Sequence, residues 1–238
     1  MKTMVFDAGP IISLVMNNLL WILEPLQKKF GGYFYITEAV KKEITDIPLQ
    51  SKKFKFEALQ VQQYLSNGVI NVIPDYKIEA HTKRLIEAAN HSFVAHNHFI
   101  QIVHNGEISV LAASCFLEAD ATVMDERTSR ELVERPNVLA DVLSKKLHTP
   151  VKINKTNLNL FKENLSAIKI IRSFELATIA FESGLLDKYL EQDEEKSVPH
   201  LRKTLLEGVL WGIKLNGCAV ARSEIDEIIS VEEREKRI

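Results

Sequence analysis

The stretch Met4-Val5-Phe6-Asp7-Ala8-Gly9-Pro10-Ile11-Ile12 decides the fold class of this chain. One acidic residue stops its apolar run, and a turn then leads into a hydrophobic segment that we expect to be helical. The pattern predicts the first strand of an α/β domain, with Asp7 at the carboxyl end of that strand. In open parallel sheets the functional crevice lies outside these strand ends. Taken alone, however, Asp7 is better explained as the cap of the following helix.

A second stretch, Ala121-Thr122-Val123-Met124-Asp125-Glu126, repeats the pattern of the first. It is a short apolar strand halted by an acid, so Asp125 is the counterpart of Asp7. Residues 33–36 and 69–73 supply two further strands. Strands that alternate with long helices predict a doubly wound, mostly parallel sheet in an α/β/α sandwich, with the strand ends at one edge.

Two glutamates accompany these aspartates. Thr37 is predicted to cap a helix in which Glu43 lies three residues after Val40, on the face expected to pack inward. A solvated Glu43 is an equally good alternative. Glu107 lies in the first turn of a helix of small and apolar residues that should be buried, and a favourable interaction with the helix dipole would by itself explain a carboxylate there.

The composition describes an ordinary globular protein. The 238 residues are 46% apolar, and 30 basic against 32 acidic side chains leave a net charge of −2, so no global field favours nucleic acid. Only two cysteines, Cys115 and Cys218, are present, and we expect both to be buried in a protein of a reducing compartment. Polar residues interrupt the apolar residues 11–26, which are too few for a membrane span. Without a signal peptide, the expected location is the cytoplasm.

Two other stretches have residues typical of binding sites. Residues 51–56 interleave Phe54 and Phe56 with three lysines, a mixture that can hold phosphates and stack a base. The favoured interpretation is a helix entry with buried phenylalanines and solvated lysines. Residues 78–104 are predicted to form one long helix, on which His91 and His98 have a spacing suited to zinc; we interpret its histidines as a polar face, with zinc as a minor alternative.

The second part of the chain is predicted to be mainly helical. A helix over residues 138–147 precedes residues 150–153, which are predicted to form the last strand. Helices are then expected over residues 160–171, 174–183 and 201–216 and from Ser223, with Asp226 completing a capping box, and the acidic residues 191–195 are expected to form a loop. These patterns predict a nuclease-like domain over residues 1–155 and a helical extension over residues 156–238.

In their order and spacing, the four acids resemble those of a PIN-domain nuclease over about residues 1–155. The resemblance rests on four short matches, which are Val5-Phe6-Asp7-Ala8-Gly9-Pro10, Thr37-Glu38-Ala39-Val40-Lys41-Lys42-Glu43, Gly106-Glu107, and Asp125-Glu126 followed by Arg130. The chain departs from the family pattern at Gly9, where a hydroxyl or Asn is usual, and Ser13 is too far along the chain to be assumed as a substitute.

The resemblance implies an endoribonuclease that hydrolyses RNA with a carboxylate-bound Mg²⁺ or Mn²⁺. Such hard cations take oxygen ligands, and a bound ion can lower the pKa of a water and neutralise charge on the phosphate. Asp7 and Asp125 are expected as direct ligands, with Glu107 sharing the ion. Glu43 would position the water or complete a second site, and Glu126 is a reserve ligand that is better explained as a solvated acid at a helix start.

An acidic pocket repels RNA, so basic side chains must hold the strand. Arg127 and Arg130 are the candidates, whereas Arg135 is better explained as an ordinary surface residue paired with Glu131 or Glu134. Single-stranded RNA is the expected partner. A toxin restrained by a small antitoxin and a processing nuclease stay open, as does a homodimer. Two alternatives are a catalytically silent PIN-like module that binds RNA or protein, and a different acidic-pocket protein such as a phosphatase or receiver.

Overall fold

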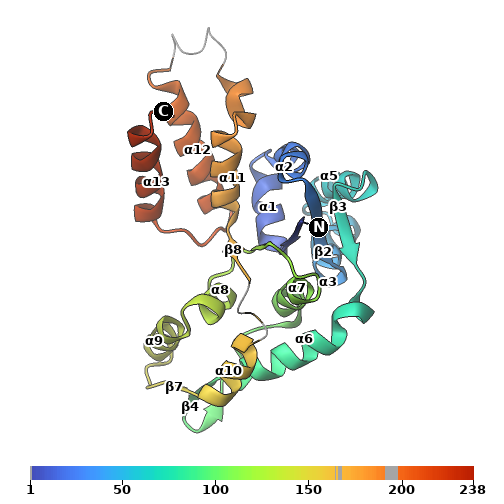
Figure 1. Ribbon diagram of the computed structural model, residues 1–238, viewed down its shortest axis with the longest axis vertical. Helices are drawn as coiled ribbons and strands as arrows, with labels where there is room; N and C mark the ends of the chain where they lie inside the picture. Colours follow the sequence, from blue (N-terminus) through green and yellow to red (C-terminus); the bar gives the residue numbers. More distant parts are fainter. Residues whose placement is uncertain (1, 164, 166–167, 191–197) are drawn as a thin grey trace.

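A computed structural model describes the chain except for residues 1, 164, 166–167 and 191–197 (Figure 1). The central sheet has five parallel strands in the order β3-β2-β1-β6-β8. Their bounds are β1 (Lys2–Phe6), β2 (Gly32–Thr37), β3 (Ile70–Ile73), β6 (Ala121–Val123) and β8 (Ile170–Ile171). The predicted α/β class with a mostly parallel sheet and further helices after it is confirmed.

The central strand β1 shows why this sheet needs helices on both faces. Successive residues of a strand point to opposite faces, and both Val5 and Phe6 are 0% exposed. Helix α7 (Asn105–Phe116) packs on β1, β2 and β6, with α6 (Asp75–Asn90) against it. Helix α1 (Ala8–Met16) contacts both α5 (Lys55–Ser66) and α11 (Ser173–Glu182).

The other helices complete the sandwich and extend it. In the first half they are α2 (Leu23–Phe30), α3 (Glu38–Lys41), α4 (Ile47–Gln50), a 3₁₀ turn (Leu20–Ile22) and a π-helix (Lys42–Asp46). Later come α8 (Arg127–Glu134), α9 (Pro136–Leu147), α10 (Lys155–Glu163), a 3₁₀ turn (Leu185–Tyr189), α12 (Leu201–Leu215) and α13 (Arg222–Arg234). Figure 1 shows α11, α12 and α13 standing together at one end of the molecule, with α9 and α10 near the other.

The predicted helix over residues 78–104 is wrong in its second half. Helix α6 ends at Asn90, and a hairpin of β4 (Phe93–Ala95) and β5 (His98–Phe99) follows, turning through His96 and Asn97, which both have positive φ. His91 and His98 therefore do not share a helical face, and the spacing argument for zinc fails. The hydrophobic pattern misled because residues 93–103 contain few turn signals other than His and Asn.

The strand predicted over residues 150–153 is present, but it is not the last strand and does not join the central sheet. Residues Lys152–Ile153 form β7, which pairs with β4 in a small antiparallel sheet. The central sheet ends instead with β8, in a region predicted to be helical up to residue 171. A strand of two residues carries almost no periodicity, so pairing with β6 rather than local sequence decides its conformation. The sheet thus takes a strand from beyond residue 155, where we expected the first domain to end.

The predicted helix caps are correct for α3 and wrong for α13. Thr37 caps α3 as predicted, its Oγ1 accepting from the Val40 amide at 3.2 Å. The cap of α13 is Ala221 rather than Ser223, and the Glu224 carboxylate accepts from the Ala221 amide at 2.7 Å. The acidic residues 191–195 lie outside the described residues.

In the described chain no single helix is long and apolar enough to cross a membrane, although Ala8–Met16 and Leu20–Phe30, bent by 117°, meet that test together.

Candidate active site

The carboxylates of Asp7, Glu43, Glu107 and Asp125 line one cavity of about 380 Å³ at the carboxyl ends of the parallel strands. We call it the carboxylate cavity. Its other walls are Ala8, Gly9, His104, Gly106, Glu126 and Gly217. The four acids come from four separate segments, so only the crossover topology brings them to one place.

Asp7 is buried, with 7% of its surface exposed, at the junction of β1 and α1. Its amide donates to the carbonyl of Val123 at 2.9 Å, which ties it to the end of β6. Asp7 holds the N-cap position of α1, yet in the described structure its side chain makes no capping hydrogen bond. An N-cap carboxylate accepts from the second or third helical amide, and the third residue here is Pro10, which has no N–H. The Asp7 carboxylate is therefore available to the cavity.

Burial raises the pKa of Asp7 from 3.8 to about 7. A hydrogen bond from the Ala8 backbone opposes this rise, whereas the charges of Glu43, Glu107 and Asp125 add to it. Both causes, desolvation and like charge, disfavour the ionised form of Asp7. A cation in the cavity would relieve both.

Asp125 is 3% exposed and is held by four hydrogen bonds. Its Oδ1 accepts from the Ser173 amide at 2.7 Å and from the Cys218 thiol at 3.2 Å. Its Oδ2 accepts from the Ser173 hydroxyl at 2.6 Å and from the Ser13 hydroxyl at 3.2 Å. A carboxylate offers about four lone-pair positions, so protein donors engage all of those on Asp125.

Glu107 is half-buried and accepts two hydrogen bonds on Oε2, from the His104 amide and from the Ser129 hydroxyl, each at 3.3 Å. The first of these bonds caps α7, so Glu107 also has a structural role at the start of this helix. Burial raises the pKa of Glu107, against the His104 hydrogen bond. Its Oε1 has no hydrogen-bond partner in the part of the chain that the structure describes.

Glu43 lies in the π-helix Lys42–Asp46, directly before the buried Ile44 and Thr45. The residue as a whole is exposed, yet it forms part of the cavity wall, and desolvation raises its pKa. The wider π-helical turn changes the angular position of Glu43 relative to the predicted α-helix. Single-turn π-helices often occur at functional sites.

Three residues that hold Asp125 were missed or undervalued at the sequence level. Ser13 was set aside, although α1 carries it to Asp125 from two turns beyond Asp7. Ser173 follows a strand that the sequence analysis did not predict. Cys218 was expected to be a buried apolar residue; it is 4% exposed, but it also donates to a carboxylate. Gly9 has no side-chain hydroxyl, and the hydroxyls that reach Asp125 are those of Ser13 and Ser173.

Comparison with known proteins adds to this geometry. A model of the PIN-domain family matches residues 3–139. The chain belongs to the PIN-domain family. PIN domains are in general nucleases and typically use a divalent metal. Searches of curated proteins and of solved structures give no match.

The donor set of this PIN domain fits a hard divalent cation in its chemistry. All four acids offer oxygen, which Mg²⁺ and Mn²⁺ prefer, and the raised pKa of Asp7 marks a place where negative charge lacks compensation. Among the described residues, however, no group of three or more His, Cys, Asp or Glu side chains is arranged so that it could hold a metal ion. Asp7, Glu43 and Glu107 are the acids least committed to other partners.

A basic surface adjoins the carboxylate cavity of the PIN domain. We call it the cationic groove, a hollow of about 720 Å³ to which α8 and the segment around Cys218 contribute. Its basic residues are Arg127, Arg130, Arg135 and Lys214. It borders the carboxylate cavity through consecutive residues, since Glu126 and Gly217 line the cavity and Arg127 and Cys218 line the groove.

The arginines of the cationic groove differ in their partners. Glu131, whose side chain is 2% exposed, pairs with Arg127 at 2.8 Å and with Arg135 at 3.8 Å. Arg130 is 8% exposed, and its buried Nε has no hydrogen-bond partner among the described residues. A ligand in the groove cannot reach this buried Nε. Among the described residues, however, Arg130 forms no ion pair, whereas Arg127 and Arg135 share Glu131, so the remainder of the Arg130 guanidinium is the least committed of the three.

Proposed function

We propose that this PIN-domain protein is a metal-dependent endoribonuclease that hydrolyses single-stranded RNA. The observation that carries the proposal is the set of four acids, Asp7, Glu43, Glu107 and Asp125, around one cavity at the strand ends. Clustered carboxylates repel one another unless a cation joins them, and Asp7 already has a pKa of about 7. Mg²⁺ or Mn²⁺ would be the cofactor.

Asp7 and Glu107 would hold the ion, and Glu43, on the open side, would orient a water or complete a second site. Asp125 contributes negative charge from a fixed position, since it is bonded to Ser13, Ser173 and Cys218. When bound, the ion would supply a water of lowered pKa and charge compensation for the phosphate and the leaving oxygen. The protein would supply the fixed placement of these oxygens on rigid strand ends.

The cationic groove would hold the RNA backbone beside the cavity. Arg127 and Arg130 are the candidates, and we favour Arg130 as the stronger phosphate ligand because Arg127 is already paired with Glu131. Guanidinium groups bind phosphate through several N–H donors in a fixed plane. We place the reaction in the cytoplasm because the sequence has only two cysteines, Cys115 and Cys218, which suits a reducing compartment.

Cleavage of a labelled single-stranded RNA in the presence of Mn²⁺ tests the proposal. We expect Asp7→Asn to lower the rate by more than about a hundredfold, because even the outer partners of metal ligands are worth about 10–100-fold. The matched control is Asp141→Asn, which changes an exposed aspartate of α9 outside the cavity. Equal activity of wild type and an Asp7→Asn, Asp125→Asn double variant would refute the nuclease assignment.

A silent PIN-like binding module is the second candidate. Two observations favour it: protein donors engage Asp125 fully, and no metal-ready cluster occurs among the described residues. Calorimetric titration with Mn²⁺ separates the candidates. If the protein is a nuclease, it should bind Mn²⁺ saturably, and Asp7→Asn should abolish that binding. A silent module should show no saturable binding of Mn²⁺.

A further inference from the structure

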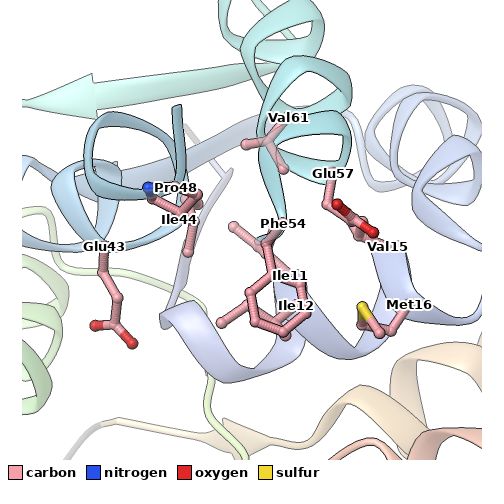
Figure 2. Close-up of a pocket in the computed structure, with 10 residues that line it drawn as sticks. All are labelled: Ile11, Ile12, Val15, Met16, Glu43, Ile44, Pro48, Phe54, Glu57 and Val61. Atoms are coloured by element: carbon pink, nitrogen blue, oxygen red, sulfur yellow. The ribbon is translucent and has the colours of Figure 1, made fainter. Parts of the chain in front are cut away.

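We propose that an apolar pocket beside the carboxylate cavity binds one base of the RNA, a guanine next to the cleaved phosphodiester. This inference rests on the proposed ribonuclease function and names the specificity of that same site. The apolar pocket is lined by Ile11, Ile12, Val15, Met16, Glu43, Ile44, Pro48, Phe54, Glu57 and Val61 (Figure 2).

The apolar pocket is continuous with the candidate active site. Glu43 lines both the apolar pocket and the carboxylate cavity. Asp7, which lines the cavity, directly precedes helix α1, which supplies Ile11, Ile12, Val15 and Met16 to the pocket. A nucleotide bound with its phosphate at the carboxylates therefore has its base within reach of this pocket.

The size and lining of the apolar pocket fit an aromatic ring. Its volume is about 100 Å³, less than the roughly 150 Å³ of an apolar cavity that binds benzene in a protein core, so it can take one edge of a base while the rest of the base lies over the exposed Phe54. Eight of the ten lining residues are apolar. A helix or strand of another protein would need a long groove, whereas a small, partly open site suits one flat ring.

Phe54 supplies a stacking surface in this pocket. Its side chain belongs to a residue that is 42% exposed, and its backbone has φ 62° and ψ 18°, a left-handed conformation rare for a bulky residue. Ser51 fastens the loop, because its hydroxyl lies within hydrogen-bond distance of two carbonyls and can donate to either, that of Lys53 at 2.6 Å or that of Pro48 at 3.0 Å. Strain of this kind persists where the surroundings impose it, and it clusters at ligand sites. Figure 2 shows the Glu57 carboxylate near the Phe54 ring and the Glu43 carboxylate farther away on the other side.

Charge at the rim of the pocket suits a nucleotide. Lys52, Lys53 and Lys55 are exposed around Phe54, and the Lys53 ammonium lies 4.5 Å from the centre of the Phe54 ring. These cations can hold a phosphate next to a stacked base. The sequence favours buried phenylalanines here, but Phe54 is 42% and Phe56 68% exposed, so the nucleic-acid interpretation of this stretch gains support.

The two carboxylates select the base. Neither Glu43 nor Glu57 makes a hydrogen bond or ion pair within the described ranges, so their oxygens are available as acceptors at the pocket. Guanine is the RNA base that presents two adjacent N–H donors on its Watson–Crick edge, and one carboxylate can accept both. Glu57 lies away from the carboxylate cavity and is the better acceptor, while Glu43 serves both spaces.

Nucleotide binding without metal or cleavage tests the pocket directly. Titrations of the full chain with GMP, AMP, CMP and UMP in the presence of a chelator, followed by amide chemical shifts, should show the tightest binding for GMP. Phe54→Ala should weaken GMP binding about tenfold, the effect of removing one stacking ring. Glu57→Gln should abolish the preference for GMP.

Matched variants distinguish a specific loss of base binding in the pocket from a general loss of structure. Phe56→Ala removes a neighbouring exposed ring that is not part of the pocket and should leave GMP binding unchanged. Phe54→Trp keeps a stacking surface and should retain binding. Thermal melting of each variant shows that it is folded.

Three outcomes would overturn the base-binding proposal. These are equal binding of the four nucleotides, GMP binding that survives Phe54→Ala, or a dimer that Phe54→Ala dissociates, which would make the pocket an interface between copies. Failure of the nuclease proposal is distinguishable. If Asp7→Asn leaves RNA cleavage unchanged while GMP binding depends on Phe54 and Glu57, the pocket stands without the ribonuclease.

Discussion

At the scale of single residues, Pro10 shapes the candidate site as much as the acids do. Without an N–H at the third position of α1, the helix offers Asp7 one amide fewer to cap, and the carboxylate stays available. The neighbouring Gly9 lies close to Asp125, since a β-carbon there would be 3.5 Å from the Asp125 Cβ. A β-carbon at this distance would make an ordinary van der Waals contact, so a residue as small as alanine would fit beside Asp125.

The raised pKa of Asp7 predicts how stability depends on pH. Between pH 3.8 and about 7 the folded chain keeps a proton on Asp7 that the unfolded chain has released. Stability from this group is therefore greatest below pH 3.8 and is lost as the pH rises through about 7.

Asp7→Asn should stabilise the protein in the presence of a chelator at pH 8 by roughly 2–4 kcal/mol, and by much less at pH 4. The asparagine keeps the shape of the side chain and removes the buried charge. Urea unfolding at both pH values measures the difference, with Asp141→Asn as the control. A variant less stable than wild type at pH 8 would contradict the pKa assignment.

At the scale of elements, the first residue of α11 decides the position of Asp125. Ser173 donates to both oxygens, through its amide and its hydroxyl. The Asp125 carboxylate thus lies at the N-terminal end of α11, where the helix dipole favours negative charge. An element from outside the region that matches the PIN-domain family therefore holds one of the four acids.

Ser173→Ala should destabilise the protein by about 1.5–3 kcal/mol, the worth of a hydrogen bond to a charged group. It should also weaken Mn²⁺ binding, because Asp125 loses its shortest contact while the backbone bond remains. Unfolding and calorimetry measure the two effects. Ser230→Ala, which removes an exposed hydroxyl of α13, should change neither. Unchanged stability of the Ser173 variant would contradict the role of α11.

Helix α8 carries the arginines of the cationic groove, and their partners predict unequal effects. Arg130→Ala should weaken RNA binding and lower the slope of log affinity against log salt by about 0.7, the value for one phosphate contact on a single strand. Arg127→Ala should have a smaller effect because Arg127 is already paired with Glu131.

Fluorescence anisotropy with labelled single-stranded RNA at several salt concentrations measures these slopes. Arg234→Ala is the control, since Arg234 is exposed on α13 and outside the groove. An unchanged slope for Arg130→Ala would show that Arg130 makes no phosphate contact.

At the scale of the whole molecule, the C-terminal helices share the core of the sandwich. Phe174, Phe181, Leu206, Leu210 and Ile213 are at most 2% exposed and belong to the same buried cluster as Val5 and Phe6. The fifth strand β8 also comes from beyond residue 155. Apolar burial of this extent is a large share of folding free energy.

A fragment that ends at residue 155 should therefore not fold on its own. It would lack β8, leave the edge of β6 unpaired and expose the apolar face of α1 that contacts α11. Circular dichroism, thermal melting and size-exclusion chromatography of the fragment measure this. A monomeric fragment with cooperative unfolding would instead support an independent domain at residues 1–155.

By itself, the sequence determined the strands β1, β2, β3 and β6, the parallel α/β class and the four acids of the candidate site. These features were predictable because strand ends and helix starts have local signals: apolar runs, Thr37 at a cap, and acids placed after buried strands. The hairpin after α6, the strand β8 and the π-helix at Glu43 have no such signals.

Only the tertiary structure decided which residues hold Asp125, which arginine lacks a partner and which pocket adjoins the carboxylates. Ser173 lies 160 residues after Ser13, and Cys218 lies 45 residues after Ser173. All three nevertheless donate to one carboxylate. Their contacts depend on sheet order and on the packing of α1 against α11, which are long-range effects. Local pattern is set by neighbours in sequence, whereas hydrogen bonds and cavities are set by neighbours in space.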